Sequence, residues 1–375
     1  MSGGMRGAGV WRREAPVERV AVAMERWTPP AGRGGPFEIE VRTGKPLDVL
    51  AFKGTDLGEV RDYAAFLKRS AQALYGEEAE LETLASCPAC DAAQPVLEEA
   101  FRVFGVAYHQ CPACGHGFVG RRPSAAAFAR HFAASDDHAA IYTDSEAAER
   151  RIARIVAPKL DWVLDLFRRH LGRAPATALD IGAGGGHFVA AARRAGIGCD
   201  GFELAEGSRR FARETFGIAL DNADFRAAPA QPVDLVTFWG LLEYIPAPRQ
   251  FLRAARARLQ PGRGMLVVEV PRLEAAGTLA QIAHPEGVAR HMDPSSHINC
   301  FSDSGLFSAL VDTGFRPVAA WYFGMDAYEL LVQCALVAGE DALVARLAHA
   351  IPLLQAGFDH GRLCDDIIVA AVPVE

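Results

Sequence analysis

The sequence predicts an α/β protein in which helices cover both faces of a doubly wound, mostly parallel sheet, with a small cysteine-containing module before it. Three observations support this prediction. From residue 176 onward, apolar runs of strand length alternate with amphipathic runs of helical length. A glycine-rich turn, "GAGGG", lies between the first of these strands and the helix that follows it. Two C-x2-C pairs precede the alternation.

The composition limits the class of protein. The chain has 375 residues, of which 50% are hydrophobic, and a formal net charge of −7. This length suffices for one large domain and a smaller one. The acidic balance, without a block of basic residues, argues against a nucleic-acid partner. No apolar segment of signal-peptide length begins the chain, and no run of about 18 apolar residues occurs in it. We therefore expect no membrane span and a cytoplasmic location.

Changes in composition and periodicity divide the chain into five expected segments. These are a poorly ordered, Gly-, Pro- and Arg-rich N-terminus (1–34), a strand and helix extension (35–84), the cysteine module (85–122), a helical linker (123–175) and the α/β domain (176–375). Alternation of residues predicts the strand at 37–44, and helical spacing of apolar residues predicts helices within 57–84 and 145–172.

Within the last segment each element is bounded by turn residues. We expect strands at residues 177–182, 198–204, 233–240, 264–270, 316–323 and 366–374. We expect helices at residues 187–196, 206–217, 248–262 and 302–315. The apolar stripes within residues 326–357 have two interpretations: packing against the edge of the sheet, or a contact in a homodimer.

The glycine-rich turn reads "LDIGAGGGHFV" over residues 179–189. Ligands of doubly wound sheets bind at the carboxyl ends of the strands, where such a turn lies. Glycines at Gly182, Gly184 and Gly186 allow a sharp turn and a close approach of the ligand, and the next helix begins with free N–H groups. The dinucleotide spacing G-x-G-x-x-G is not met, because His187 stands where its last glycine would be. The spacing present is D-x-G-x-G-x-G, which begins at Asp180.

This motif resembles the first motif of the class I S-adenosylmethionine-dependent methyltransferases. The segments "VDLVTFWGLLEYI" (233–245) and "SSHINCFSDSGLFSALVDTGF" (295–315) are similar to later parts of the same family. The resemblance implies a seven-stranded, Rossmann-like sheet. It also implies that Asp180 and the glycines hold the methionine part of S-adenosyl-L-methionine.

The resemblance extends to the rest of the cofactor site. Glu203 ends the second strand and is expected to accept hydrogen bonds from the ribose hydroxyls. The expected contact to adenine is Asp224, with Asp221 as the alternative, and Trp239 is expected to line the pocket wall. The chain departs from the family at Tyr244, where relatives often have histidine after Leu-Glu. No role of that histidine carries over.

The cysteine pairs "CPAC" and "CPACGHG" give the spacing C-x2-C-x20-C-x2-C. Two such turns can place four thiolates tetrahedrally around Zn²⁺, with Zn–S bonds of about 2.3 Å. The expected ligands are Cys87, Cys90, Cys111 and Cys114, which makes the zinc structural because no position is left open. His109 or His116 could replace a thiolate. The module resembles zinc ribbons in front of bacterial methyltransferases that act on sugars or natural-product precursors.

Transfer to a hydroxyl or carbon nucleophile needs a base. Glu243 and Tyr244 follow the third strand of the α/β domain and are candidates. The connection over residues 271–301 is too long for a simple link, and such loops are often functional. It contains the further candidates His284, His291, Asp293 and His297. We favour His297 because its context, "SSHINCFS", most resembles the family segment.

Together these observations predict an enzyme, an S-adenosylmethionine-dependent methyltransferase with a small-molecule acceptor, either a sugar or a biosynthetic intermediate. One alternative is a methyltransferase of ribosomal or transfer RNA whose zinc ribbon reads nucleic acid. The other is a non-catalytic binding protein on the same fold. The intact glycine loop and Glu203 favour the first, since a scaffold needs neither.

Overall fold

The computed structural model describes residues 12–13, 17–19, 22–30, 34–45, 49–53, 56–76, 80–94, 96–134, 145–284 and 292–374. None of the helices in these ranges is long and apolar enough to cross a membrane.

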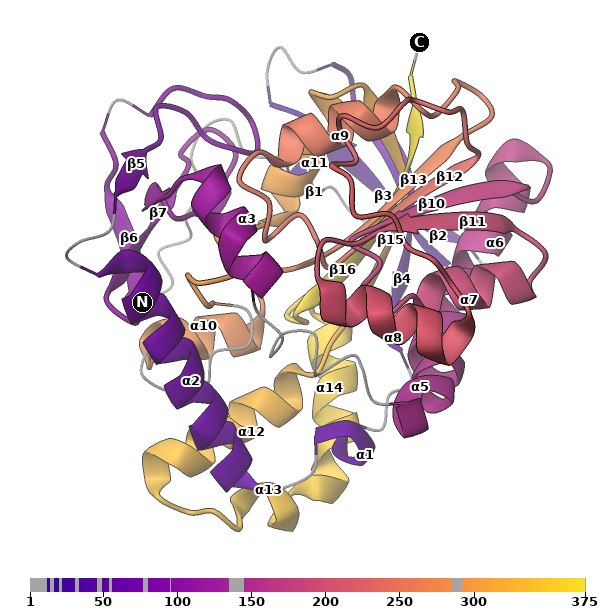
Figure 1. The fold of residues 1–375 in the computed structure, drawn as a ribbon. Helices are drawn as coiled ribbons and strands as arrows, with labels where there is room; N and C mark the ends of the chain where they lie inside the picture. Colours follow the sequence, from indigo (N-terminus) through magenta and orange to yellow (C-terminus); the bar gives the residue numbers. More distant parts are fainter. Residues whose placement is uncertain are drawn as a thin grey trace.

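A single large sheet lies at the centre of the molecule (Figure 1). Its strand order is β1-β3-β4-β15-β16-β13-β12-β10-β11, and β2 pairs with β3. The strands of the α/β domain are β10 (Thr177–Ile181), β11 (Gly198–Phe202), β12 (Leu235–Trp239), β13 (Met265–Pro271), β15 (Phe315–Phe323) and β16 (Asp366–Pro373). Strands β11, β10, β12 and β13 pair in parallel, and β16 is antiparallel to both of its neighbours. The predicted doubly wound α/β fold is confirmed.

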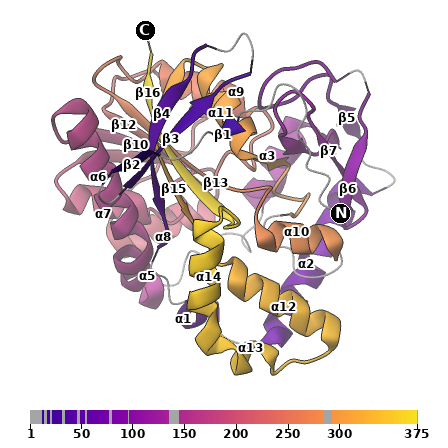
Figure 2. The ribbon, with the colours of Figure 1, turned by 180° about the vertical axis from the view of Figure 1, so that it is seen from behind.

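Within the described residues the sheet has ten strands, six from the α/β domain and four from the N-terminal part of the chain, whereas seven were predicted. The additional strands are β1 (Arg12–Arg13), β2 (Val17–Arg19), β3 (Val22–Thr28) and β4 (Phe37–Thr43), which extend the sheet beyond β15 (Figure 2). At the opposite edge, the chain after the second helix of the domain contributes only a single bridge, between Phe202 and Asp221.

The expectation of a poorly ordered N-terminus up to residue 34 is wrong for β3. Glu25 and Trp27 alternate with exposed or half-buried neighbours and are themselves buried. The Trp27 ring lies 4.4 Å from that of Phe307, and Glu25 pairs with Arg362 from the other end of the chain. The Gly, Pro and Arg residues that surround this short strand give the whole segment a composition typical of irregular chain, which hides the alternation within β3.

Helices cover both faces of the sheet. One face packs against α6 (Ala157–Leu171), α7 (His187–Arg194) and α8 (Glu206–Phe216), and the other packs against α9 (Pro248–Arg256) and α11 (Asp303–Val311). Before α6 the chain forms α5 (Ser145–Arg151) and a π-helical turn, η1 (Ile152–Val156). These positions agree with the helices that the sequence predicts.

A helical lobe lies at one end of the sheet (Figure 1). It contains α1 (Leu50–Lys53), α2 (Leu57–Tyr75), α12 (Asp326–Ala338), α13 (Leu343–Arg346), η2 (Ala348–Ala350) and α14 (Ile351–His360). Leu57 of α2 and Tyr328 and Val332 of α12 share one buried cluster. Packing therefore accounts for the buried apolar residues of 326–357, and a homodimer contact stays a prediction. The helix expected within 57–84 ends at Tyr75.

The cysteine module contains β5 (Leu81–Thr83), β6 (Glu99–Val103), β7 (Val106–Gln110), β8 (Gly117–Phe118) and β9 (Arg121–Pro123), followed by α3 (Ala125–Ala134). Its main sheet has the order β14-β8-β7-β6. Strand β14 (Asn299–Cys300) belongs to the long connection that follows β13 and contains α10 (Ala276–Ala283). The module and the α/β domain therefore share a sheet.

Candidate active site

The turn from β10 into α7 has the backbone conformation that requires glycine. The φ angles of Gly182, Gly184 and Gly186 are +72°, +52° and +76°, in the left-handed region. A Cβ on Gly182 would lie 2.8 Å from Leu241 Cδ1, whereas no described atom lies within 4 Å of a Cβ placed on Gly184. The turn is thus tight on the side of the β12 loop and open at Gly184, where a ligand can approach the backbone.

Glu203 lies beside this opening. Its carboxylate accepts hydrogen bonds from the backbone N–H groups of Gly184 and Ala205, both at 2.8 Å. A carboxylate has about four acceptor positions, so two remain for other donors. Glu203 is therefore held at the glycine turn with capacity for the two hydroxyls of a cis-diol.

Asp180 is buried beneath the turn, with 2% of its surface exposed. The Thr237 hydroxyl donates a 2.7 Å hydrogen bond to its Oδ1. Burial, opposed by that hydrogen bond and assisted by the charge of Glu203, raises the pKa of Asp180 to about 7. A cationic ligand group near Asp180 would favour its ionised form.

The two candidates for the adenine contact are both exposed. Asp224 forms an ion pair with Arg226 at 2.7 Å, and this hydrogen-bonded partner lowers its pKa. Asp221 accepts a hydrogen bond from Ala223 N at 2.8 Å. The choice between them stays a prediction. Trp239, at the end of β12, lies 5.1 Å from Phe188, and its Nε1 has no hydrogen-bond partner among the residues that the structure describes.

Two of the predicted catalytic candidates meet. The Tyr244 hydroxyl lies 3.0 Å from His297 Nε2, and the rings contact edge to face with centroids 4.8 Å apart. His297 is 8% exposed. The pair lies just beyond the carboxyl end of β12, the strand next to the one that leads into the glycine turn. A tyrosine hydroxyl bonded to an imidazole nitrogen can relay a proton.

A buried turn supports His297. The backbone N–H of His297 donates to Asp293 O at 2.6 Å. The Asp293 carboxylate accepts hydrogen bonds from the hydroxyls of Ser295 and Ser296, each at 2.7 Å. Through these contacts Asp293 stabilises the turn. His297 therefore lies on a hydrogen-bonded turn and not on an unsupported loop.

The other candidates occupy different environments. Glu243 is 3% exposed, and burial together with the nearby Glu269 and Asp366 raises its pKa well above the usual value. Its Oε2 has no hydrogen-bond partner among the described residues. Burial therefore favours its protonated form, which suits a proton donor better than a base. His284 is exposed at the end of α10, and His291 lies outside the described residues.

A charged group on the same edge of the sheet was not predicted from the sequence. Lys159 Nζ on α6 lies 2.6 Å from Glu269 Oε1 on β13. Lys45 follows β4, donates to Ile155 O at 3.2 Å, and lies 4.9 Å from the Phe323 ring centroid. Burial, together with the charge of Lys159, lowers the pKa of Lys45 to about 7. A usable signal was present: Glu269 interrupts the apolar strand "MLVVEVP".

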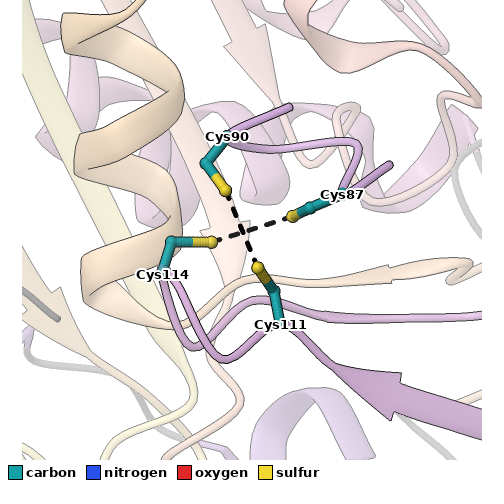
Figure 3. A group of neighbouring side chains, drawn as sticks. All are labelled: Cys87, Cys90, Cys111 and Cys114. Atoms are coloured by element: carbon teal, nitrogen blue, oxygen red, sulfur yellow. Dashed lines mark hydrogen bonds between the residues drawn. The ribbon is translucent and has the colours of Figure 1, made fainter. Parts of the chain in front are cut away.

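The four cysteines of the module converge, as Figure 3 shows. All four are buried, and their Sγ atoms lie within 4.8 Å of one another. The distances from Cys87 to Cys114 and from Cys90 to Cys111 are both 3.7 Å. Four sulfurs at 2.3 Å from a tetrahedral zinc ion would be about 3.8 Å apart. The donor set and its spacing therefore fit a metal ion of this type.

The two halves of this site have the same backbone structure. Asp91 and Gly115, which follow the second cysteine of each pair, have positive φ angles of 63° and 74°. Their N–H groups donate to the carbonyls of Cys87 and Cys111 respectively, both at 2.8 Å. Each C-x2-C pair thus closes the same tight turn, which brings its two thiols to one side.

A family model described as a methyltransferase domain matches residues 147–320. The ubiquinone biosynthesis O-methyltransferase of Bordetella parapertussis is 30% identical over 189 residues, which cover 48% of this chain and 77% of that protein. The chain belongs to the S-adenosylmethionine-dependent methyltransferases. It is an enzyme of the class I fold.

Two further matches show how far the similarity extends. The ubiquinone biosynthesis O-methyltransferase of Bordetella avium is 31% identical over 132 residues, 33% of this methyltransferase, and the match spans about half (54%) of that relative's length. Among solved structures, 1,6-didemethyltoxoflavin-N1-methyltransferase of Burkholderia thailandensis has a TM-score of 0.39 and 16% identity, with 66% of this chain and 87% of that chain covered.

Proposed function

We propose that this methyltransferase transfers a methyl group to a hydroxyl oxygen of a small-molecule acceptor, either a sugar or another biosynthetic intermediate. The observation that carries the proposal is the Tyr244–His297 hydrogen bond of 3.0 Å, which lies one strand away from the glycine turn. An oxygen acceptor is supported by the relatives from Bordetella, which are named O-methyltransferases. A hydroxyl needs a base, and this pair offers one.

The residues that would hold S-adenosyl-L-methionine are those of the glycine turn with Glu203 and Asp180. The opening at Gly184 leaves room for the cofactor, and Glu203 retains the acceptor positions that ribose hydroxyls require. When bound, the cofactor supplies a methyl group on an activated sulfonium centre, so the protein must align the acceptor and remove its proton.

His297 and Tyr244 perform the proton removal in this proposal. The acceptor hydroxyl donates to the phenolic oxygen of Tyr244, whose own proton passes to His297 Nε2. One proton thus leaves the acceptor oxygen as that oxygen gains the methyl group, and the imidazole carries the resulting charge. The Asp293 turn holds the imidazole in place during the transfer.

Lys45, Lys159 and Glu269 are proposed to contact the acceptor. The cofactor residues lie over β10 and β11, whereas Glu269 lies on β13 and Lys45 follows β4, farther along the sheet. The ammonium group of Lys159 also lies 5.3 Å from the centroid of the Trp239 ring, which links these charged residues to the cofactor residues. A methyl-acceptor molecule with hydroxyl or anionic groups could accept hydrogen bonds from the two lysine ammonium groups and donate one to the Glu269 carboxylate.

We also propose that the four cysteines bind Zn²⁺ in a structural role. Tetrathiolate coordination fills all four positions, so the metal would hold the module together without touching the acceptor.

A label-transfer experiment tests the function. The purified protein is incubated with methyl-labelled S-adenosylmethionine and separate pools of sugars, nucleotide-sugars, phenolic compounds and RNA. We expect label in a hydroxyl-bearing small molecule. His297→Ala should lower the rate of transfer by about 10²- to 10⁴-fold, whereas His284→Ala, which changes an exposed histidine of the same connection, should not. Label in RNA alone, or full transfer by His297→Ala, would contradict the proposal.

A further inference from the structure

We propose that His116 and Asn299 are positioning residues that couple the cysteine module to the Tyr244–His297 pair. The module is then a working part of the catalytic centre rather than a separate binding unit. The inference rests on the proposed function of that pair, but its contacts can be tested without a substrate.

Asn299 fixes the backbone around Tyr244. It is completely buried, and its Nδ2 donates to Leu242 O at 3.1 Å and to Ile245 O at 2.7 Å. Its backbone N–H donates to Glu243 O at 3.1 Å. One residue therefore holds three carbonyl groups on either side of Tyr244. Since Asn299 also follows His297 by two positions, it sets the distance between the two catalytic candidates.

His116 contacts the other end of the Asn299 side chain. An amide has a donor end and an acceptor end, and only one orientation turns the donor end toward Leu242 and Ile245. His116 Nε2 lies 3.3 Å from Asn299 Oδ1, and an amide oxygen can only accept, so the imidazole donates this bond. Reversing the amide would bring its oxygen against the carbonyl oxygens of Leu242 and Ile245, which cannot donate. The bond from His116 satisfies the other end of the amide and so helps to hold it in the orientation that fixes the Tyr244 loop.

The metal-binding turn in turn holds His116. The residue follows Cys114 by two positions, and its carbonyl accepts a hydrogen bond from Cys111 N at 2.9 Å. Its ring is fully buried between Phe118, with which it is parallel at 6.1 Å, and Phe301 at 4.5 Å. The turn that begins at Cys111, together with the two phenylalanine rings, therefore fixes the place of the imidazole.

Further contacts join the module to the segment that bears His297. The buried Tyr108 hydroxyl of β7 donates to His297 O at 3.0 Å. Val119 N donates to Ile298 O at 2.9 Å, and β14 pairs with β8. The Ser302 hydroxyl, at the start of α11, donates to Cys114 O at 3.2 Å. The module thus contacts the segment from His297 through Ser302.

The variant His116→Phe tests the coupling. Phenylalanine keeps the ring packing against Phe118 and Phe301 but cannot donate to Asn299. We expect kcat to fall 10- to 100-fold, while KM for S-adenosylmethionine stays within twofold and one metal ion per chain is retained. In hydrogen–deuterium exchange, the amides of Ile245 and Asn299 should exchange at least tenfold faster than in the unchanged protein.

The matched control is Gln110→Leu. It removes the 3.0 Å hydrogen bond from Gln110 Nε2 to Gly115 O, which lies inside the same cysteine turn and does not involve residues 297–302. We expect wild-type kcat and wild-type exchange at Ile245 and Asn299. If this control and His116→Phe behave alike, the proposed coupling is wrong.

If His116→Phe does not fold, removal of the metal from the unchanged protein provides a second test. After chelation, exchange should accelerate over residues 242–245 and 297–300, while β10 and β12 remain protected. Unchanged exchange at 242–245 would overturn the inference. Absence of methyl transfer by the unchanged protein would instead count against the proposed function, because the exchange measurement needs no acceptor.

Discussion

Tyr244 and His297 are 53 positions apart in the chain and meet through a single hydrogen bond. If that bond relays the acceptor's proton, His297→Ala should lower kcat by about 10²- to 10⁴-fold, the usual contribution of a general base. The dissociation constant of S-adenosylmethionine should not change, because His297 lies outside the glycine turn. Steady-state kinetics and calorimetric titration check the two parts. A weakened cofactor affinity with unaltered kcat would place His297 in the cofactor site instead.

Glu203 allows a second prediction for a single residue. Replacing it with alanine removes the carboxylate that is expected to accept two ribose hydroxyls, each such charged hydrogen bond being worth about 1.5–3 kcal/mol. The dissociation constant of S-adenosylmethionine should rise at least tenfold in calorimetric titration. Glu206→Ala, in the next turn and exposed, is the control and should bind normally. Equal binding by both variants would contradict the predicted role.

Asp180 predicts a dependence of stability on pH. Burial raises its pKa from 3.8 to about 7, so the folded state favours the protonated form. The stability that this protonation provides is complete below about pH 4 and is lost as the pH rises through 7. Asp180→Asn cannot ionise and should therefore gain up to about 4 kcal/mol relative to the unchanged protein between pH 4 and 8. Urea unfolding at the two pH values measures the difference. Parallel stability curves would refute it.

Spacing along the sequence made some of these residues predictable. Asp180, Gly182, Gly184 and Gly186 lie within one turn, and Glu203 ends the next strand, so local pattern sufficed. Lys45, Lys159 and Glu269 come from three elements far apart in the chain, and only the strand pairing brings them together. His116 and Asn299 were equally hidden, since their contact crosses 183 positions.

At the scale of elements, the join between β13 and α11 depends on a buried ion pair. Arg272, just after β13, is 3% exposed and binds the Asp303 carboxylate at 2.6 and 2.9 Å. Asp303→Ala should lower the free energy of unfolding by about 3–5 kcal/mol, because it leaves a buried guanidinium with only the more distant carboxylate of Glu274, at 3.9 Å. Asp165→Ala breaks an exposed pair with Arg169 and should cost less than about 1 kcal/mol. Equal effects in denaturant unfolding would show that Arg272 finds another partner.

Periodicity placed most strands and helices of the α/β domain within a few residues, but it did not find α10 in the long connection after β13. It did not find β3, since the residues that bury Glu25 and Trp27 come from α11 and the far C-terminal part of the chain. It also did not find β14, because a strand of two residues has no period. Both strands are stabilised by residues that are distant in the sequence: β14 pairs with β8, and β3 contacts Phe307 and Arg362.

At the scale of the whole molecule, the module and the α/β domain form one unit. All four cysteines share a buried cluster with Phe301 and Leu306 of the α/β domain, and β14 completes the module's sheet. Cys111→Ser should therefore weaken more than the module. Structural zinc sites supply free energy to folding itself, of order 10 kcal/mol in small peptides. We expect a single calorimetric transition at a temperature at least 10 °C lower, because loss of the proposed metal would expose part of a common core.

Cys334→Ser provides the matched control, because this cysteine is exposed on α12 and lies outside the buried cluster. Its unfolding temperature should match that of the unchanged protein. If the module were an independent ribbon attached by a linker, Cys111→Ser would instead split the transition into an early step for the module and an unaltered step for the α/β domain. A split transition would also remove the structural basis for coupling through His116, since the sheet that contains β14 would then open without disturbing the rest of the core.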